Sequence, residues 1–257
     1  MGNAVFITGA AKGTGFCSAE LFAKNGWDVF LTSRRGEEAE ASAKLLSEKY
    51  GILSKGYECN IGNEEQIKAI FEDIDKQNTT LKTVVLMAAN LGFDPKDPAA
   101  GQDFWTVSVE DFRCVFETNL VWNFMIVRQA SLRMKEAGGG SIVFISSNTA
   151  YRAIPNRAAY SASKGGINSL SRALAVDLGQ YGIRSNVVLP GTIKTERWQN
   201  MNKNKTISGS LTPLGDISDF EDIANAVWYF GTDLSKNVTG SELVVDGGMM
   251  SQLTPRG

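Results

Sequence analysis

Tyr160 and Lys164 stand four residues apart in the run Y-S-A-S-K, and this pair could do proton-transfer chemistry. On a helix, residues at i and i+4 share one face, so a phenol and an ammonium can project side by side into one pocket. A free tyrosine has a pKa of about 10, and an adjacent cation favours the phenolate and lowers that pKa. The spacing predicts a general acid-base pair matched to working pH. A solvated helix face can carry the same spacing, so the neighbouring residues decide the interpretation.

Ser147 follows an apolar run and lies upstream of this pair. The chain contains no histidine, which excludes Ser-His-Asp triads and histidine-ligated metals. Its three cysteines, Cys17, Cys59 and Cys114, are widely spaced and fit neither a disulfide framework nor a zinc motif. Catalysis must then use tyrosine, lysine, serine, cysteine or carboxylates, and we predict no metal in the site.

A glycine-rich turn, T-G-A-A-K-G-T-G, joins the first predicted strand to the first predicted helix. Its glycines permit a tight turn and close approach of a ligand to the backbone, while the helix N-terminus offers free N-H groups to a pyrophosphate. At this place in the chain, the turn predicts dinucleotide binding rather than a purely structural role. The residues that we assign to it are Gly9, Lys12, Gly13, Thr14 and Gly15.

The second predicted strand ends in the run T-S-R-R, which includes Ser33, Arg34 and Arg35. Sites for NAD usually place a carboxylate here to hold the ribose 2'-hydroxyl. In this chain no carboxylate stands ready to repel a 2'-phosphate, and arginine can bind one through charge-assisted hydrogen bonds. With Lys12 as a second cation, we predict NADP(H) over NAD(H), with Ser33 and Arg34 as contacts. The alternative is that the two arginines only solvate a loop.

Short apolar runs alternate with longer helical patterns, which predicts seven strands joined by crossover helices. Right-handed connections of this length generate a parallel sheet covered on both faces. We therefore expect the α/β class, with residues 1–257 forming one Rossmann-like, doubly wound domain. The predicted strands are Ala4–Thr8, Asp28–Thr32, Ser54–Asn60, Thr83–Ala89, Ser141–Ser146, Ile183–Leu189 and Ser241–Asp246.

Two helix starts and two loops can also be placed. Asn63 with Gln66, and Ser218 with Glu221, fit the spacing of capping boxes before apolar helical patterns. The stretches 91–107 and 193–214 break the alternation after strand ends, where open parallel sheets bind their ligands. We predict substrate loops there, and name residues 192–215 as the substrate-loop region. Plain surface excursions are the alternative.

Taken together, these residues resemble the short-chain dehydrogenase/reductase family across essentially the whole chain. Further motifs carry the resemblance: I-S-S ending in Ser147, E-T-N-L with Asn119, I-R-S-N-V-V-L-P-G ending in Gly191, and V-T-G-S-E-L-V-V-D-G-G. The resemblance implies hydride transfer between a nicotinamide and a carbonyl or secondary alcohol, as in 3-oxoacyl reductases and sugar or alcohol dehydrogenases. It also implies a homotetramer, formed partly through the long helices after strands four and five.

The same resemblance assigns roles to single residues. Tyr160 is implied to be the general acid in reduction and the general base in oxidation, with Ser147 holding the substrate oxygen. Lys164 is implied to lower the tyrosine pKa and to bind ribose hydroxyls, and Asn119 to hold a relay water by interrupting the helix. Tyr160 and Lys164 are also implied to contact the cofactor. The other implied cofactor contacts are Asn60, Ile61, Ala89, Pro190, Gly191, Ile193 and Thr195.

Two positions depart from the family pattern. The family commonly has N-N-A-G after strand four, whereas this chain reads M-A-A-N with Met87 and Ala88, which puts side-chain bonds that brace the sheet in doubt. Asn60 stands where an aspartate commonly faces the adenine amino group, and its amide can still accept that bond.

The substrate is less sharply indicated. The run between Ser147 and Tyr160 is strongly polar, and as a hypothesis Arg152 or Arg157 contacts a carboxylate, a phosphate or several hydroxyls. This favours a polar keto-acid or a sugar-like substrate. Opposing it, an apolar pocket for hydrophobic ketones could be built from Phe93, Trp105, Trp198 and Met201. The predicted substrate contacts are Asn148, Thr149, Arg152, Arg157 and Trp198.

The composition indicates which kinds of partner and which cellular location to expect. The formal net charge is -2 with basic residues scattered, so we expect no nucleic acid partner. No apolar run approaches the roughly 20 residues that cross a bilayer, and no secretory signal pattern opens the sequence, so we expect a cytoplasmic protein. A cofactor-binding sensor without turnover is the alternative class. The intact set of Asn119, Ser147, Tyr160 and Lys164 argues against that alternative.

Overall fold

Seven parallel strands form one sheet in the order β3-β2-β1-β4-β5-β6-β7. The computed structural model describes residues 2–60, 62–92, 103–195, 198 and 212–254. The strands are β1 (Gly2–Ile7), β2 (Asp28–Ser33), β3 (Ser54–Glu58), β4 (Thr79–Leu86), β5 (Gly140–Ile145), β6 (Ile183–Pro190) and β7 (Glu242–Val245). The strand order reverses between β1 and β4, so the loops after these strands diverge and leave a crevice for a ligand. The predicted single α/β domain is confirmed.

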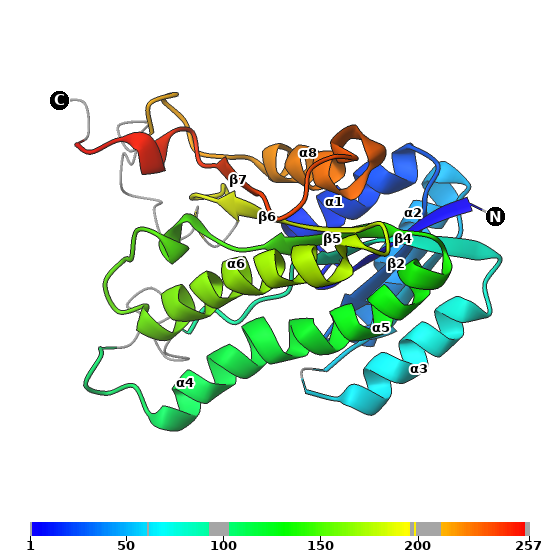
Figure 1. The fold of residues 1–257 in the computed structure, drawn as a ribbon, viewed down its shortest axis with the longest axis horizontal. Helices are drawn as coiled ribbons and strands as arrows, with labels where there is room; N and C mark the ends of the chain where they lie inside the picture. The colour runs from blue at the N-terminus through cyan, green and yellow to red at the C-terminus, as the bar shows by residue number, and fades with distance from the viewer. Residues whose placement is uncertain (1, 61, 93–102, 196–197, 199–211, 255–257) are drawn as a thin grey trace.

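Helices cover both faces of the sheet (Figure 1). One face carries α1 (Gly13–Lys24), α2 (Gly36–Tyr50) and α8 (Phe220–Gly231), and the other carries α3 (Glu64–Asp75), α4 (Val109–Phe116), α5 (Trp122–Glu136) and α6 (Ala158–Gly179). Each face encloses its own apolar cluster. Phe22 and Phe230 lie in the first, and Phe71 and Ile126 in the second. Burial on both sides explains why the central strands read as continuous apolar runs.

Strand β4 begins and ends earlier than the sequence predicted, at Thr79 and Leu86. It ends there because the backbone N-H groups of Met87 and Ala88 bond to a side chain instead of to the neighbouring strand. The hydroxyl of Thr8 accepts from Met87 N at 2.9 Å and from Ala88 N at 3.1 Å. The Thr8 hydroxyl, at the end of β1, thus holds the backbone at the end of β4.

One of the two predicted helix caps is found and the other is displaced. The Asn63 side chain accepts from Gln66 N at 2.9 Å and caps the start of α3, while the Gln66 side chain accepts from Asn60 N instead of closing the predicted box with Asn63. The capping box of α8 is formed by Asp219 and Asp222 instead of Ser218 and Glu221. The Ser218 hydroxyl does not cap α8, because it donates to the carbonyl of Val245 at 3.3 Å.

Helix α2 lies unusually close to strand β3. A Cβ added to Gly56 would stand 2.1 Å from the carbonyl carbon of Ala39, so only glycine fits at this crossing. By contrast, Gly51 ends α2 in the left-handed conformation, with φ of 68°, and an added Cβ would meet nothing within 4 Å. The first glycine is required by packing and the second by backbone conformation.

Among the described helices, none combines the length and the apolar character needed to cross a membrane.

Candidate active site

Ser147 and Tyr160 are brought together by the end of β5 and the start of α6. Ser147 precedes the short 3-10 turn Asn148–Ala150 and accepts a hydrogen bond from Thr149 N at 3.2 Å. Tyr160 lies in the first turn of α6, close enough to the Ser147 hydroxyl for that group to lower its pKa. Two hydroxyl groups therefore face one point beyond the carboxyl end of the sheet.

Lys164 follows one turn along α6 and is 2% exposed. Its Nζ donates to the carbonyl of Ile145 at 2.7 Å and lies 5.5 Å from the centre of the Tyr160 ring. Burial lowers the pKa of Lys164 to about 7. An amine held in this way is poised near neutrality and carries much less than a full charge above that pH.

Burial raises the pKa of Tyr160 to about 12, while the hydrogen bond to Ser147 and the charge of Arg157 act in the opposite direction. The predicted depression of this pKa by Lys164 is not found in this structure. The physical reason is that desolvation dominates and the ammonium of Lys164 is directed to Ile145 O. At neutral pH the phenol of Tyr160 therefore carries its proton.

Asn119 lies in a π turn, Glu117–Val121, which separates α4 from α5. Its side chain is buried, donates to Asn90 O at 2.8 Å and to Ser163 Oγ at 3.0 Å, and accepts from Asn90 N at 2.7 Å. The amide of Asn123 donates to the backbone carbonyl of Asn119 at 2.8 Å. The predicted interruption of the helix is present, and it ties the loop after β4 to α6. The relay water stays a prediction.

The glycine turn lies between β1 and α1, as predicted. Gly9 and Gly13 have φ of 64° and 59°, and a Cβ on Gly15 would stand 2.5 Å from Gly9 O. No side chain caps the N-terminus of α1 and no acidic residue occupies its first turn. The N-H groups and positive dipole of this helix end therefore suit a pyrophosphate.

A cavity of about 670 Å³ opens beside this turn, beyond the ends of β1, β2 and β4. Five residues assigned from sequence line it: Gly9, Lys12, Ser33, Arg34 and Ala89. Sequence reasoning missed further lining residues, among them Glu38, Cys59, Asn90, Thr118 and Trp122. The cavity and the uncapped helix end together fit the adenosine and phosphate parts of a dinucleotide.

The two arginines after β2 differ in their surroundings. Arg35 forms an ion pair with Glu38 at 2.7 Å, one helical turn away, whereas Arg34 is exposed and makes no ion pair within the described part of the chain. Glu38 is a carboxylate that the sequence prediction did not weigh. Because it neutralises Arg35, Arg34 and Lys12 are the cations of the cavity that remain for a phosphate.

Other predicted cofactor contacts lie around the same crevice. The Asn60 amide donates to Glu58 at 2.8 Å, which leaves its oxygen able to accept. Gly191 follows Pro190 at the end of β6, and an added Cβ would stand 2.5 Å from Asp246 Cβ. Ile193 pairs with the backbone of Ser218, and the hydroxyl of Thr195 accepts from Trp198 N at 3.1 Å. Ile61 lies outside the described residues.

The predicted substrate residues differ in how close they lie to Ser147 and Tyr160. Asn148 and Thr149 directly follow Ser147, and the hydroxyl of Thr149 is buried with no hydrogen-bond partner among the described residues. Arg157 is half-buried and its charge acts on Tyr160. Arg152 instead donates to the backbone carbonyls of Met249 and Gln252.

The predicted apolar pocket is not assembled by the residues that the structure describes. Trp105 is 88% exposed and packs against Phe104, so it lies on the surface. Trp198 is half-buried after Thr195. Phe93 and Met201, with most of the predicted 192–215 region, lie outside the described residues.

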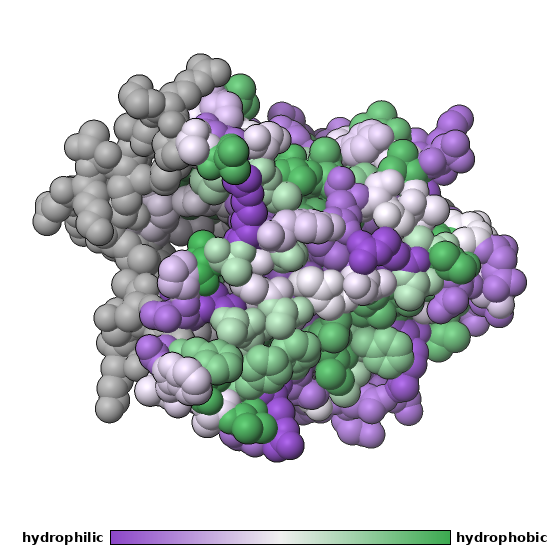
Figure 2. All heavy atoms as spheres, turned by 60° about the vertical axis from the view of Figure 1, so that its left-hand side comes forward, coloured by the Kyte–Doolittle hydropathy of each residue, from purple (hydrophilic) through white to green (hydrophobic). Residues whose placement is uncertain are grey.

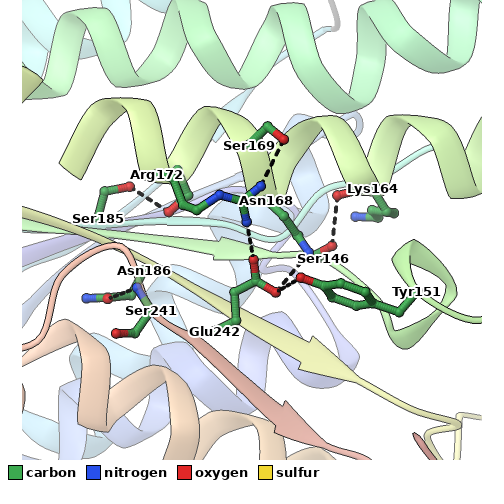
Figure 3. Close-up of polar contacts among 11 residues, drawn as sticks. Ser146, Tyr151, Lys164, Asn168, Ser169, Arg172, Ser185, Asn186, Ser241 and Glu242 are labelled. Carbon is green, nitrogen blue, oxygen red and sulfur yellow. Dashed lines mark hydrogen bonds and ion pairs between the residues drawn. The ribbon is translucent and has the colours of Figure 1, made fainter. Parts of the chain in front are cut away.

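Sequence reasoning also missed a polar cluster next to the site (Figure 3). The carboxylate of Glu242, at the start of β7, accepts from Tyr151 Oη, from Asn168 Nδ2 at 3.1 Å and from Arg172 at 2.6 Å. The cluster joins the loop between Ser147 and Tyr160 to β7 and α6. Tyr151 and Glu242 are far apart in sequence, so no local pattern indicates the contact.

A second cavity, of about 910 Å³, lies at the opposite, amino ends of the strands. Trp27, Trp228, Lys82 and Arg184 are among its lining residues, and none of the residues predicted to act in catalysis or binding belongs to it. Its place in the fold separates it from the crevice at the carboxyl ends, where parallel sheets bind their ligands.

Within the described residues, no group of three or more histidine, cysteine, aspartate or glutamate residues could hold a metal ion. The proton donors that the structure gathers at the crevice are hydroxyl groups. They suit a reaction in which negative charge develops on a substrate oxygen and is stabilised by hydrogen bonds.

Comparison with known proteins gives the family. The family model described as enoyl-(acyl carrier protein) reductase matches residues 9–250. The chain belongs to the short-chain dehydrogenase/reductase family. As a short-chain dehydrogenase/reductase, it is an oxidoreductase with the Rossmann-like fold of that family.

Two curated short-chain dehydrogenase/reductases show how broad the likeness is. A 3-oxoacyl-[acyl-carrier-protein] reductase from Chlamydia trachomatis is 31% identical over 246 residues, covering 95% of each chain. An L-rhamnose-1-dehydrogenase from Scheffersomyces stipitis is 33% identical over 262 residues, covering 98% of this chain and 97% of that protein. Among solved structures, ElxO with NADP bound is 29% identical, has a TM-score of 0.87 and covers 98% of this chain and 100% of its own.

Proposed function

We propose that the protein transfers a hydride between NADP(H) and a carbonyl or secondary alcohol. The observation that carries this proposal is that Ser147 acts on the ionisation of Tyr160 at the carboxyl end of the sheet, beside a cavity lined by Gly9 and Lys12 of the glycine turn and by Arg34. The nicotinamide supplies the hydride when the cofactor is bound. The chain supplies orientation, hydrogen-bond donors and a proton.

In reduction, Tyr160 gives its proton to the substrate oxygen, and Ser147 holds that oxygen by a hydrogen bond. The raised pKa of Tyr160 keeps the phenol protonated at neutral pH, which is the state that a general acid needs. In oxidation the same residue takes the proton back, and the positive charge of Arg157 favours the phenolate.

Lys164 and Asn119 would support Ser147 and Tyr160 by positioning the cofactor and the relay water. The amine of Lys164 would hold ribose hydroxyls, with its position fixed by the bond to Ile145 O. Asn119, bound to Ser163 on α6 and to Asn90 in the loop after β4, would hold the relay water and keep both elements in place.

The residues fit NADP(H) better than NAD(H), because Arg34 and Lys12 line the cavity without the charge neutralisation that Glu38 imposes on Arg35. The relative solved with NADP bound supports the same choice. The cofactor would be held by Gly9, Gly13, Thr14 and Gly15 at the pyrophosphate.

The substrate that we propose is a polar keto-acid or a sugar-like ketone or alcohol. Arg157 supports it, since this cation lies close enough to Tyr160 to act on its ionisation. The two curated relatives are named for an oxoacyl substrate and for a sugar. Both classes present polar groups beside the reacting carbon.

The decisive test is reduced-nicotinamide absorbance with purified protein and a panel of keto-acids, sugar-like ketones, diketones and hydrophobic ketones. We expect turnover with NADPH that Tyr160→Phe lowers at least about 100-fold, because the general acid is lost while the ring is kept. Tight NADPH binding with no turnover of any ketone would favour the sensor alternative.

A second test addresses the cofactor. Arg34→Ala should weaken NADPH binding about tenfold or more in a fluorescence titration, because a charge-assisted hydrogen bond to the 2'-phosphate is lost, and leave NADH binding within about twofold. Arg35→Ala is the matched control and should have a smaller effect, since Arg35 is paired with Glu38. Equal affinities of the unchanged protein for NADPH and NADH would contradict the assignment.

We also propose that the protein is a cytoplasmic homotetramer. The three cysteines are free, as a reducing compartment would keep them. Large apolar side chains are exposed on α4, α5 and α6: Phe112, Phe124, Leu132 and Val176. Figure 2 shows hydrophobic side chains gathered across the lower half of one face of the molecule. Such faces are commonly covered in an assembly.

A further inference from the structure

The segment Asp246–Gln252 follows β7 and folds back toward the candidate active site. Asp246 is 4% exposed, and its carboxylate accepts from Gly248 N and from Met250 N, each at 2.8 Å. Gly247 and Gly248 both have positive φ, so the chain turns sharply here. A buried carboxylate bonded to two N-H groups fixes this turn firmly.

One side of the segment is held by the loop between Ser147 and Tyr160. Arg152 Nη1 donates to Met249 O at 3.0 Å and to Gln252 O at 2.6 Å. The Asn148 amide nitrogen lies 3.5 Å from the Met249 sulfur. Arg152 therefore spans the last turn of the segment, and Met249 faces the residue next to Ser147.

The other side of the segment is held by the end of the predicted substrate-loop region. Leu214 N donates to Gly247 O at 3.1 Å. A Cβ added to Gly248 would stand 2.9 Å from the ring of Pro213, so the two backbones are in close contact. The segment thus bridges the two loops that flank the crevice.

A short series of contacts connects Met249 to the reacting groups. Ser147 acts on the ionisation of Tyr160, and Ser147 Oγ lies 3.5 Å from Asn148 Oδ1. The other end of the same amide meets Met249, while Gly191 packs beneath it. Met249 is accordingly an apolar side chain that lies one residue contact away from Ser147, through the Asn148 amide.

We propose that Met249 forms a wall of the substrate pocket and limits the size of the group attached to the reacting carbonyl. Arg152 is a positioning residue that holds this wall in place and does not bind a substrate anion. The proposal rests on the proposed reductase function and names its specificity-determining side chain. Methionine suits this place, because its flexible thioether adapts to apolar groups of varied shape.

The experiment measures kcat and KM with NADPH for three neutral diketones of increasing bulk: 2,3-butanedione, 2,3-hexanedione and 1-phenyl-1,2-propanedione. Met249→Ala should raise kcat/KM for the phenyl compound at least about tenfold relative to butanedione, mainly through KM. Met250→Ala is the matched control and should preserve the size order. An equal change in both variants, or none in Met249→Ala, overturns the assignment of Met249.

Arg152 is tested with the same neutral diketones and with pyruvate as an anion. Arg152→Ala should raise KM for the neutral and anionic compounds alike by about tenfold, with kcat and NADPH affinity within about threefold, and Arg152→Lys should restore part of the loss. If Arg152→Ala weakens only pyruvate, Arg152 is an anion ligand and the positioning role is wrong.

A failure of the proposed reductase function can be distinguished from a failure of the Met249 proposal. If the unchanged protein turns over no ketone, the same size order is read from dissociation constants of the three diketones from the NADP-bound protein, measured by fluorescence. Hydrogen exchange of residues 246–252 gives a second reading. Exchange that stays unchanged in Arg152→Ala contradicts the holding role, and exchange at least about tenfold faster supports it.

Discussion

The side-chain amine of Lys164 is buried and donates a hydrogen bond to the carbonyl of Ile145. Its pKa is lowered from 10.5 to about 7 by burial. Between these two values the unfolded chain binds more protons at this residue than the folded protein does. The free energy of unfolding should therefore rise with pH between pH 7 and pH 10.5. Below pH 7, where the buried amine is charged, Lys164 should lower that free energy by its full amount.

The variant Lys164→Met tests this linkage, because it keeps a long apolar stem and removes the titrating group. The unfolding free energy of the unchanged protein minus that of the variant should increase from pH 7 to pH 9, by at most about 1.4 kcal/mol per pH unit. Denaturant unfolding in the absence of cofactor at several pH values measures it. A difference that stays constant with pH would show that the amine is not destabilised by burial.

At the level of elements, α2 packs against β3 and follows Arg34 and Arg35, which line the cavity proposed to hold the nucleotide. This contact depends on Gly56, where no Cβ can be accommodated against Ala39. Gly56→Ala should destabilise the protein by about 3 kcal/mol or more, since backbone must move. Gly51→Ala, the control, changes only a left-handed position in open space and should cost about 1 kcal/mol.

Urea unfolding of both variants checks this prediction, with NADPH affinity as a second measurement. Gly56→Ala should also weaken NADPH binding, because α2 carries the cavity wall, whereas Gly51→Ala should leave it within about twofold. Equal losses of stability in the two variants would mean that the close crossing is relaxed easily.

The sequence allowed the elements to be predicted well, because each signal was local. Glycine spacing placed the turn after β1, apolar runs placed the strands, and Asn63 marked the start of α3. The errors have physical causes. Strand β4 ends early because Thr8 captures the N-H groups of Met87 and Ala88. The partner of Arg152 lies about 100 positions along the chain, so no spacing rule could find it.

Tyr160 and Ser147 were correctly expected to meet, whereas their ionisation was not correctly anticipated. Spacing on a helix says which side chains share a face. It does not say how much water reaches them, and desolvation set the pKa of Tyr160.

At the scale of the whole molecule, the exposed side of α5 and α6 is the face that the proposed tetramer would cover. Val176 on α6 is 80% exposed. A charge in a buried interface is strongly unfavourable, so Val176→Glu should convert the tetramer into smaller species in light scattering after size exclusion. Leu45→Glu, on the exposed side of α2, should leave the assembly unchanged. A monomeric unchanged protein would contradict the proposal.

The two ends of the described chain lie on opposite sides of the molecule (Figure 1). Strand β1 begins at Gly2, at the amino edge of the sheet, while the segment after β7 borders the candidate active site. For immobilisation or fusion, this arrangement recommends attachment through the N-terminus. A surface or carrier joined there would lie away from Ser147 and Tyr160, whereas one joined after β7 would lie beside the entrance that the proposed substrate would use.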